Sequence, residues 1–351
     1  VILFRRRFYL VFFFGIVFLS AFRYYVGSDF FNYANLYRYS QLGLDPIVQV
    51  EYSYLFISRF LGEMGFNFQA IIALYCILTY TFIYMGLKQI SHDKGFLGVV
   101  IFFVYIVFYF PSLSIMRQSL AISIVFWGTY RFLHNEKYLK FLITVGVAYL
   151  FHISSLLYIL CIPFYIFKLQ RISYILGISL AAVLGMTFFG SIVEFFAKLF
   201  GISFKSYSFI PTPIPAPIFL INTGVMILGF IFVIINFKPK DHFLINIIFF
   251  MIVMRLLALD FIHITRFSAA FNIFIPIFLY HIVFSRLTGG LKYLLLILCA
   301  VVLTINDSFR AKKDYSYYQY SINMCVYGDP CPISIVGDVP LSDLLIREHK
   351  R

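Results

Sequence analysis

Long apolar stretches recur along the whole chain, and they constrain its fold more than any other feature. A helix that crosses a bilayer needs about 20 mostly apolar residues, because the hydrocarbon core is about 30 Å thick. Residues 52–62 are apolar but too short, and we expect an interfacial or re-entrant helix there. The candidate spans are eleven stretches, at 8–25, 67–87, 95–112, 116–133, 139–152, 153–167, 172–190, 216–237, 243–260, 267–285 and 290–305.

The composition excludes several classes of protein. Hydrophobic residues make up 62% of the chain and charged residues 12%, whereas soluble domains are about 45–50% apolar and about 25% charged. A soluble globular enzyme, a disordered chain and a disulfide-stapled secreted domain are therefore excluded. The net charge of +13 does not indicate a nucleic-acid partner, because membrane proteins gather Lys and Arg in their cytoplasmic loops. We expect an all-α polytopic membrane protein with about 11 transmembrane helices.

The region 139–167 allows two topologies. It forms either one long helix or a hairpin of two short helices with His152 at the apex. With the hairpin, the inner loops hold fourteen basic residues and the outer loops seven, leaving out the C-terminal tail. With a single helix the split is eleven to ten, and the positive-inside bias disappears. We therefore favour the hairpin. The arginines at 5–7 predict a cytoplasmic N-terminus, and with eleven spans the C-terminus is then expected in the periplasm.

Three segments are long enough to build a site on the outer face. They are the outer loops 26–51 and 191–215 and the tail 306–351, which follows a transmembrane domain at 1–305. In the eleven-span topology most acidic residues also fall on this side, so we expect any chemistry there. The outer loops could roof a cavity at the outer leaflet, or they could be plain connecting loops.

Arg117 and His152 are ionisable residues at the edges of apolar spans. A charge within a span costs about 2.5–3.5 kcal/mol on insertion scales, so such residues mark functional sites by default. The planar guanidinium of Arg117 can bind phosphate or carboxylate with two parallel hydrogen bonds, or it can snorkel to the headgroups. His152 can exchange a proton near neutral pH, or it can be a core histidine that bonds a backbone carbonyl.

A second polar cluster lies late in the chain. Arg266 follows His263 by three residues and Asp260 by six, and Arg255 sits deeper in the preceding span. These four residues could form part of a site, or they could make an internal Arg–Asp pair that fixes helix packing. Clustered arginines at the leaflet surface suit an anionic lipid head, particularly a pyrophosphate, and so predict a lipid-linked substrate.

Two acidic residues and the absence of common motifs limit the kinds of site that this sequence could form. Asp29 and Glu51 bracket the first outer loop and could bind substrate or simply be solvated. The sequence has no metal-binding spacing, no P-loop and no dinucleotide glycine motif. We therefore expect no metal and no cofactor.

Five short segments between residues 23 and 285 carry a further pattern. They are Gly27-Ser28-Asp29 with Tyr33, Glu51 with the YSYLFISRF that follows, Met116-Arg117-Gln118, Phe151-His152-Ile153-Ser154, and Arg266-Phe267. In order and placement they resemble motifs of the EpsG-like branch of the Wzy-type O-antigen, capsule and exopolysaccharide polymerases. The family's proline after the glutamate is absent after Glu51.

The resemblance implies a membrane glycosyltransferase of the bacterial inner membrane. Such enzymes polymerise oligosaccharide repeat units, carried on undecaprenyl pyrophosphate, at the periplasmic face. The products are the O-antigen of lipopolysaccharide, capsule or exopolysaccharide. It also implies a GT-C-like helical bundle with periplasmic loops, metal-independent catalysis, contact with membrane lipid, and a chain-length regulator as a potential partner.

The resemblance also implies roles for residues. Arg117 and Arg266 would hold the pyrophosphate, and His152 would take or orient the proton of the acceptor hydroxyl. The remaining candidates for substrate binding are Asp29, Tyr33, Glu51, Arg255, Asp260 and His263. Two alternatives stay open: a flippase for lipid-linked oligosaccharides and an O-antigen ligase.

Overall fold

The described part of the chain is helical, with one pair of two-residue strands. The computed structural model describes residues 8–24, 26–27, 29–44, 51–90, 100–101, 104–187, 217–236, 242–259, 265–286 and 321–322. The first half contains α1 (Phe8–Ala21), β1 (Arg23–Tyr24), α2 (Phe30–Gln41), α3 (Tyr52–Glu63), α4 (Phe68–Ile90), the π-helical turn η2 (Tyr105–Tyr109), α6 (Phe110–Ser114), α7 (Met116–Arg131), the 3-10 turn η3 (Leu133–Asn135) and α8 (Tyr138–Tyr149).

The described residues of the second half are also mainly helical. It contains the 3-10 segment η4 (Ile153–Leu160), α9 (Cys161–Ile166), α10 (Arg171–Thr187), α12 (Pro217–Asn236), α13 (His242–Leu257), α14 (Thr265–Ala270), η6 (Asn272–Phe274), α15 (Ile275–Arg286) and β2 (Ser321–Ile322). β1 and β2 pair antiparallel, with Arg23 opposite Ile322. The all-α expectation is confirmed for the described residues, apart from this short pair.

Helices fill the apolar stretches expected to span a membrane. Each expected stretch except 290–305, which lies outside the described residues, contains helical structure. Among the described residues, only α4 is both long enough and apolar enough to cross a bilayer, and five further apolar helical segments have 10–17 residues. Helix length therefore establishes one candidate span, and the count of about eleven stays a prediction.

The region 139–167 forms the hairpin. α8 ends at Tyr149, and His152 has extended backbone dihedrals (φ −161°, ψ 129°) before η4 begins. At the other end of the hairpin, the Tyr165 hydroxyl lies 3.5 Å from the carbonyl oxygen of His134, and the two rings lie 5.3 Å apart. The chain thus returns to the level at which α8 began, and the single-helix alternative is wrong.

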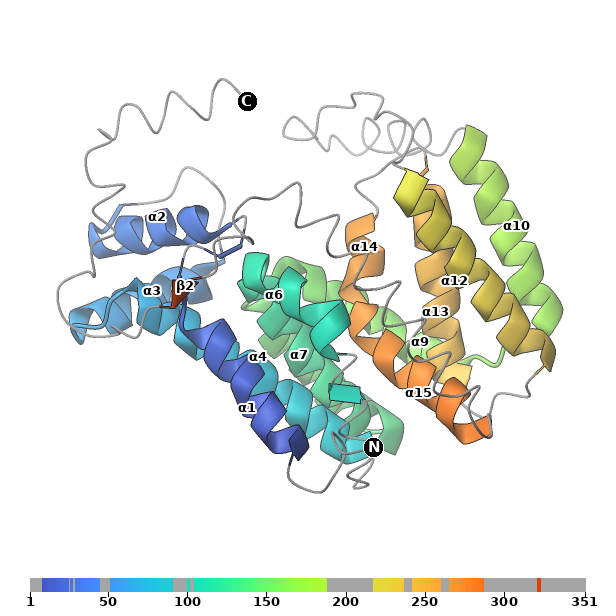
Figure 1. Cartoon of the computed structure of the whole chain (residues 1–351), viewed down its shortest axis with the longest axis horizontal. Coiled ribbons are helices and arrows are strands. Elements are labelled where there is room, and N and C mark those ends of the chain that lie inside the picture. The colour runs from blue at the N-terminus through green and yellow to red at the C-terminus, as the bar shows by residue number, and fades with distance from the viewer. Residues whose placement is uncertain are drawn as a thin grey trace.

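Two short helices, α2 and α3, lie across the ends of α1 and α4 (Figure 1). α3 covers the stretch at 52–62 that was expected to form a short helix. It buries Tyr54 and leaves Phe56 and Phe60 exposed, as an interfacial helix does. α2 was not expected within the outer loop 26–51, although Phe30, Tyr33 and Ala34 follow helical spacing and are buried. The loop 191–215 and most of the tail 306–351 lie outside the described residues.

Glycines allow close helix contacts in both halves of the molecule. A Cβ atom added at Gly86 of α4 would lie 2.6 Å from the Phe126 ring of α7. One added at Gly185 of α10 would lie 2.0 Å from the Leu256 carbonyl oxygen of α13. Small residues at such contacts let helix backbones approach closely, which stabilises helix pairs where no water is displaced.

We expect a Gly185→Ala variant to unfold more easily, because the clash is with backbone atoms that no rotamer change can move. The expected loss in the free energy of unfolding is about 1–3 kcal/mol, the usual cost of overpacking. Thermal unfolding of the purified protein in detergent measures it. Gly146→Ala is the matched control, since Gly146 of α8 has no atom within 4 Å of its added Cβ, and wild-type stability in Gly185→Ala would contradict the prediction.

Candidate functional site

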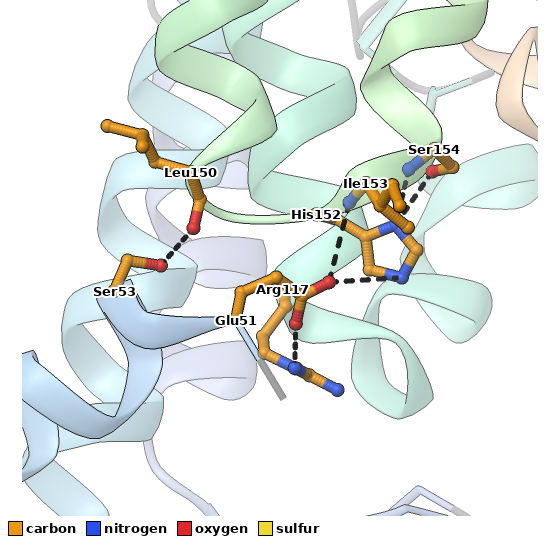
Figure 2. Close-up of polar contacts among 7 residues, drawn as sticks. All are labelled: Glu51, Ser53, Arg117, Leu150, His152, Ile153 and Ser154. Carbon is orange, nitrogen blue, oxygen red and sulfur yellow. Dashed lines mark hydrogen bonds and ion pairs between the residues drawn. The ribbon is translucent and has the colours of Figure 1, made fainter. Parts of the chain in front are cut away.

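Glu51, Arg117 and His152 meet at one end of the helix bundle (Figure 2). They come from the residue before α3, the first turn of α7 and the apex of the α8–η4 hairpin. Arg117 Nη1 donates to Glu51 Oε2. Glu51 Oε1 lies 4.0 Å from His152 Nε2 and accepts the Ile153 N–H at 3.4 Å. The side chains are only 16–25% exposed, so solvent screens these interactions weakly.

The start of α3 is fixed to the hairpin apex by local contacts. Glu51 has extended backbone dihedrals (φ −64°, ψ 133°), and its carbonyl accepts the Tyr54 N–H at 3.1 Å. The Ser53 hydroxyl donates to the Leu150 carbonyl. These contacts point the Glu51 side chain across the gap between α3 and α7, between Arg117 and His152.

His152 caps the returning arm of the hairpin. Its Nδ1 accepts the Ser154 N–H at 3.1 Å, and the Ser154 hydroxyl oxygen lies 2.8 Å from the same nitrogen. An imidazole nitrogen thus takes the place of the oxygen that usually caps a helix N-terminus. The cap fixes the ring plane and directs Nε2 toward Glu51, as Figure 2 shows.

Two tyrosines form a wall against Arg117. The guanidinium carbon lies 5.5 Å from the ring centroid of Tyr33 and 5.8 Å from that of Tyr54. Tyr54 is completely buried, and its ring centroid lies 5.9 Å from that of Tyr75, with the two ring planes tilted by 55°. Its hydroxyl donates to the Tyr33 carbonyl at 2.8 Å. Cation–π contact of this kind holds a guanidinium through the face of its plane, so it does not occupy the N–H donors, of which one donates to Glu51. Arg117 Nε is buried and has no hydrogen-bond partner among the described residues.

Burial keeps the tyrosines uncharged. It raises the pKa of the Tyr33 phenol, which the neighbouring Arg117 guanidinium opposes, and it raises the pKa of the Tyr54 phenol well above its usual range. Neutral phenols therefore add no charge of their own beside Arg117 and Glu51. The tyrosines shape the site and do not exchange protons near neutral pH.

Asp29 and Tyr33 belong to the start of α2. Asp29 precedes the helix and is half-buried, and its carbonyl accepts the Tyr33 N–H at 3.0 Å. The sequence assigned both residues to substrate binding. In the structure the Tyr33 ring faces Arg117, which makes it a support for the guanidinium.

The late polar cluster is only partly described. Asp260 and His263 lie outside the described residues, and so does the side chain of Arg266, whose backbone belongs to α14. The Arg255 Nε donates to the Ser268 hydroxyl at 3.3 Å, which joins α13 to α14. α14 in turn contacts the arm that follows His152, since the Tyr158 hydroxyl donates to the Ala270 carbonyl. In the view of Figure 1, α14 lies near the middle of the molecule, at about the height of α2 and α3.

Arg23 is a buried arginine whose structural role the sequence did not reveal. Its guanidinium is 1% exposed, and it donates to the Ser20 carbonyl at 2.9 Å and the Leu113 carbonyl at 3.0 Å. It also lies 2.9 Å from the Cys76 sulfur. Arg23 therefore ties the end of α1 to α4 and to the end of α6, just before the helix that carries Arg117.

Several residues of the site were missed in the sequence. Tyr54 follows Glu51 by three residues and so stands on the same face, a helical spacing that could have indicated it. Ser154 is the last residue of the Phe151-His152-Ile153-Ser154 segment, where only the histidine was given a role. Among the described residues, no group of three or more His, Cys, Asp or Glu side chains is placed to hold a metal ion.

Comparison with known proteins places the chain in a family. Searches among curated proteins and among solved structures found no match. The family model described as "EpsG family" matches residues 6–322, which include all five segments on which the resemblance rested. The expectation from those segments is confirmed: the chain belongs to the EpsG family.

Proposed function

We propose that this protein is a membrane glycosyltransferase that polymerises polyprenyl-pyrophosphate-linked oligosaccharide units at the periplasmic face of the bacterial inner membrane. Its family indicates a membrane protein with a polysaccharide polymerase-like function. The helical fold agrees with this class. The choice of substrate and of membrane face is argued from the site and from the charge distribution.

The observation that carries the proposal is the set of contacts that holds the Arg117 guanidinium. Its guanidinium is held by two tyrosine rings and one carboxylate, beside a histidine, at the end of an apolar bundle. The N–H donors of a guanidinium form a rigid planar fork whose spacing matches two phosphate oxygens. The buried Nε of Arg117 has no hydrogen-bond partner among the described residues. A pyrophosphate whose lipid tail runs into the bilayer suits this position.

This placement of Arg117 suits the proposed reaction. A sugar hydroxyl of one lipid-linked unit attacks the anomeric carbon of the growing chain, and the bond from that carbon to the pyrophosphate breaks. The leaving pyrophosphate takes the electron pair, and Arg117 stabilises the charge that develops there. Arg266 would add a second guanidinium from α14, and Asp29 would contact sugar beside α2.

Loss of the gene tests the function. We expect a deletion strain to make only single repeat units on its final surface lipid, or to accumulate single lipid-linked units, and the wild-type gene to restore the ladder of long polymer. Gel analysis of the surface polysaccharide and of the lipid-linked pool measures both. Complete loss of surface sugar would indicate a flippase instead, and long polymer that stays unattached to its acceptor would indicate a ligase.

A further inference from the structure

We propose that Glu51 accepts the proton of the attacking hydroxyl, and that His152 is a positioning residue that holds Glu51 and takes no proton itself. The inference rests on the proposed polymerase function and names the base of that reaction. It reverses the division of roles that the sequence suggested, in which the histidine handles the proton and the glutamate binds sugar.

The first argument is the tautomer of His152. A backbone N–H can only donate, so the contact from the Ser154 amide at 3.1 Å makes Nδ1 an acceptor. A neutral imidazole with an accepting Nδ1 carries its proton on Nε2. That nitrogen faces Glu51 Oε1 at 4.0 Å. As long as the Ser154 cap is intact, His152 has no free lone pair with which to take a proton.

The second argument is the surroundings of Glu51. Oε1 faces the Ile153 N–H and His152 Nε2, whereas Oε2 is held by Arg117 alone among the described residues. The phenols of Tyr33 and Tyr54 approach from α2 and α3, and burial raises the pKa of both, so neither is an acid near neutral pH. Oε1 is thus oriented by the hairpin apex. Oε2 is held by Arg117, which in the proposed reaction also binds the substrate.

The third argument is competition for Arg117. A pyrophosphate carries more negative charge than a carboxylate and presents several oxygens to the guanidinium fork. When it binds, donors of Arg117 turn from Glu51 to the phosphates. Oε2 is then left as an open acceptor directly beside the anomeric carbon. Binding of the donor lipid therefore exposes the base that the ion pair with Arg117 otherwise covers.

The step balances in atoms and charge. The hydroxyl proton of the acceptor sugar passes to Glu51 Oε2 while the hydroxyl oxygen forms a bond to the anomeric carbon. The bond from that carbon to the pyrophosphate oxygen breaks, and the electron pair leaves with the pyrophosphate on Arg117. Glu51 ends protonated and returns its proton to water after the polyprenyl pyrophosphate departs.

Two substitutions at His152 separate the possible roles. His152→Gln reaches the Nε2 position and can still donate to Glu51, but it cannot act as a base. His152→Asn can cap the Ser154 N–H, as asparagine commonly does, but it is too short to reach Glu51. We measure elongation of a synthetic polyprenyl-pyrophosphate-linked repeat unit by the full chain in proteoliposomes, with Glu51→Gln alongside.

We expect His152→Gln to keep at least about a tenth of the wild-type rate, and both His152→Asn and Glu51→Gln to lose about 100-fold or more, the usual size of a general-base effect. Equal losses in Gln and Asn would make His152 the base and overturn the inference. A reversed order, with Asn active and Gln inactive, would reduce His152 to a helix cap. A wild-type chain that elongates nothing would instead refute the polymerase function itself.

The tautomer has a readout that is independent of activity. We expect ¹⁵N-histidine spectra of the wild-type protein to show an unprotonated Nδ1 and a protonated Nε2 at His152, identified by the signal that disappears in His152→Gln. The opposite tautomer would leave Nε2 free to accept a proton and would overturn the inference even if elongation is normal.

Discussion

An Arg117→Lys variant is expected to elongate lipid-linked units at least about 100-fold more slowly than the wild type, and to leave short polymer on the cell surface. Removing one donor that stabilises developing charge typically costs 10²–10³ in rate, which is roughly 2.7–4 kcal/mol. Lysine keeps the positive charge, but it presents a single point of donation where the guanidinium presents a fork. It also lacks the planar face with which the guanidinium lies against the Tyr33 and Tyr54 rings. In-vitro elongation rates and the gel ladder of surface polysaccharide measure the effect.

The matched control for this substitution is Arg131→Lys. Arg131 ends the same helix, is exposed, and lies 3.5 Å from the Gln89 side chain at the opposite end of the bundle. We expect its rate and ladder to stay at the wild-type level. Full polymer length in Arg117→Lys would show that no bidentate grip on the pyrophosphate is needed. A drop in both variants would indicate a general effect on the helix.

A Tyr54→Ala variant is expected to lose about 3–5 kcal/mol of stability, the usual cost of deleting a fully buried aromatic side chain. Tyr54 is completely buried where α2, α3 and α4 meet, with its ring near Tyr33, Tyr75 and Arg117. Its loss opens a cavity beneath the guanidinium and removes the hydroxyl that donates to the Tyr33 carbonyl. Unfolding by heat or denaturant in detergent, followed by hydrogen exchange of α2 and α3, measures the change.

Two further substitutions divide this effect into its parts. Tyr54→Phe removes only the hydroxyl that donates to the Tyr33 carbonyl, and we expect a loss of about 0.5–1.5 kcal/mol. Tyr52→Ala, on the same helix but 89% exposed, is expected to stay within about 0.5 kcal/mol of the wild type. If Tyr54→Ala were no less stable than Tyr52→Ala, the packing of α3 against α4 would have to differ from the structure.

Charge patterning in the sequence favoured the hairpin at 139–167, although it left the single helix open, and the structure then showed the hairpin. The pattern was informative because the positive-inside bias is a sum over many residues. No single lysine or arginine had to be placed correctly for the hairpin to be favoured. The helix α2 was missed for the opposite reason. Its twelve residues mix Phe and Tyr with Asn, Arg and Gln, so no window there reaches the apolarity of a span, and its helical spacing had to be sought at a finer scale.

Arg117 and His152 could be picked out from the sequence, because an ionisable side chain at the edge of an apolar span is costly wherever it ends up. Their relation to Glu51 could not. Glu51 and Arg117 are 66 positions apart, and Glu51 and Ile153 are 102 apart. The sequence around a carboxylate in an outer segment looks the same whether the carboxylate is solvated or paired with an arginine. The spacing of Tyr54 from Glu51 could have placed it beside the site, but its complete burial depends on which helices cover it.

The amino-acid sequence by itself determined a helical, apolar, membrane-type chain of this family, because burial of apolar surface and the cost of unpaired backbone groups act on every residue locally. Only the tertiary structure decided that Glu51 bridges Arg117 and His152, that the Ser154 cap fixes the imidazole, and that Arg23 locks α1 to α4 and α6. Ion pairs and hydrogen bonds act over a few ångströms, so they exist only after distant segments have packed together.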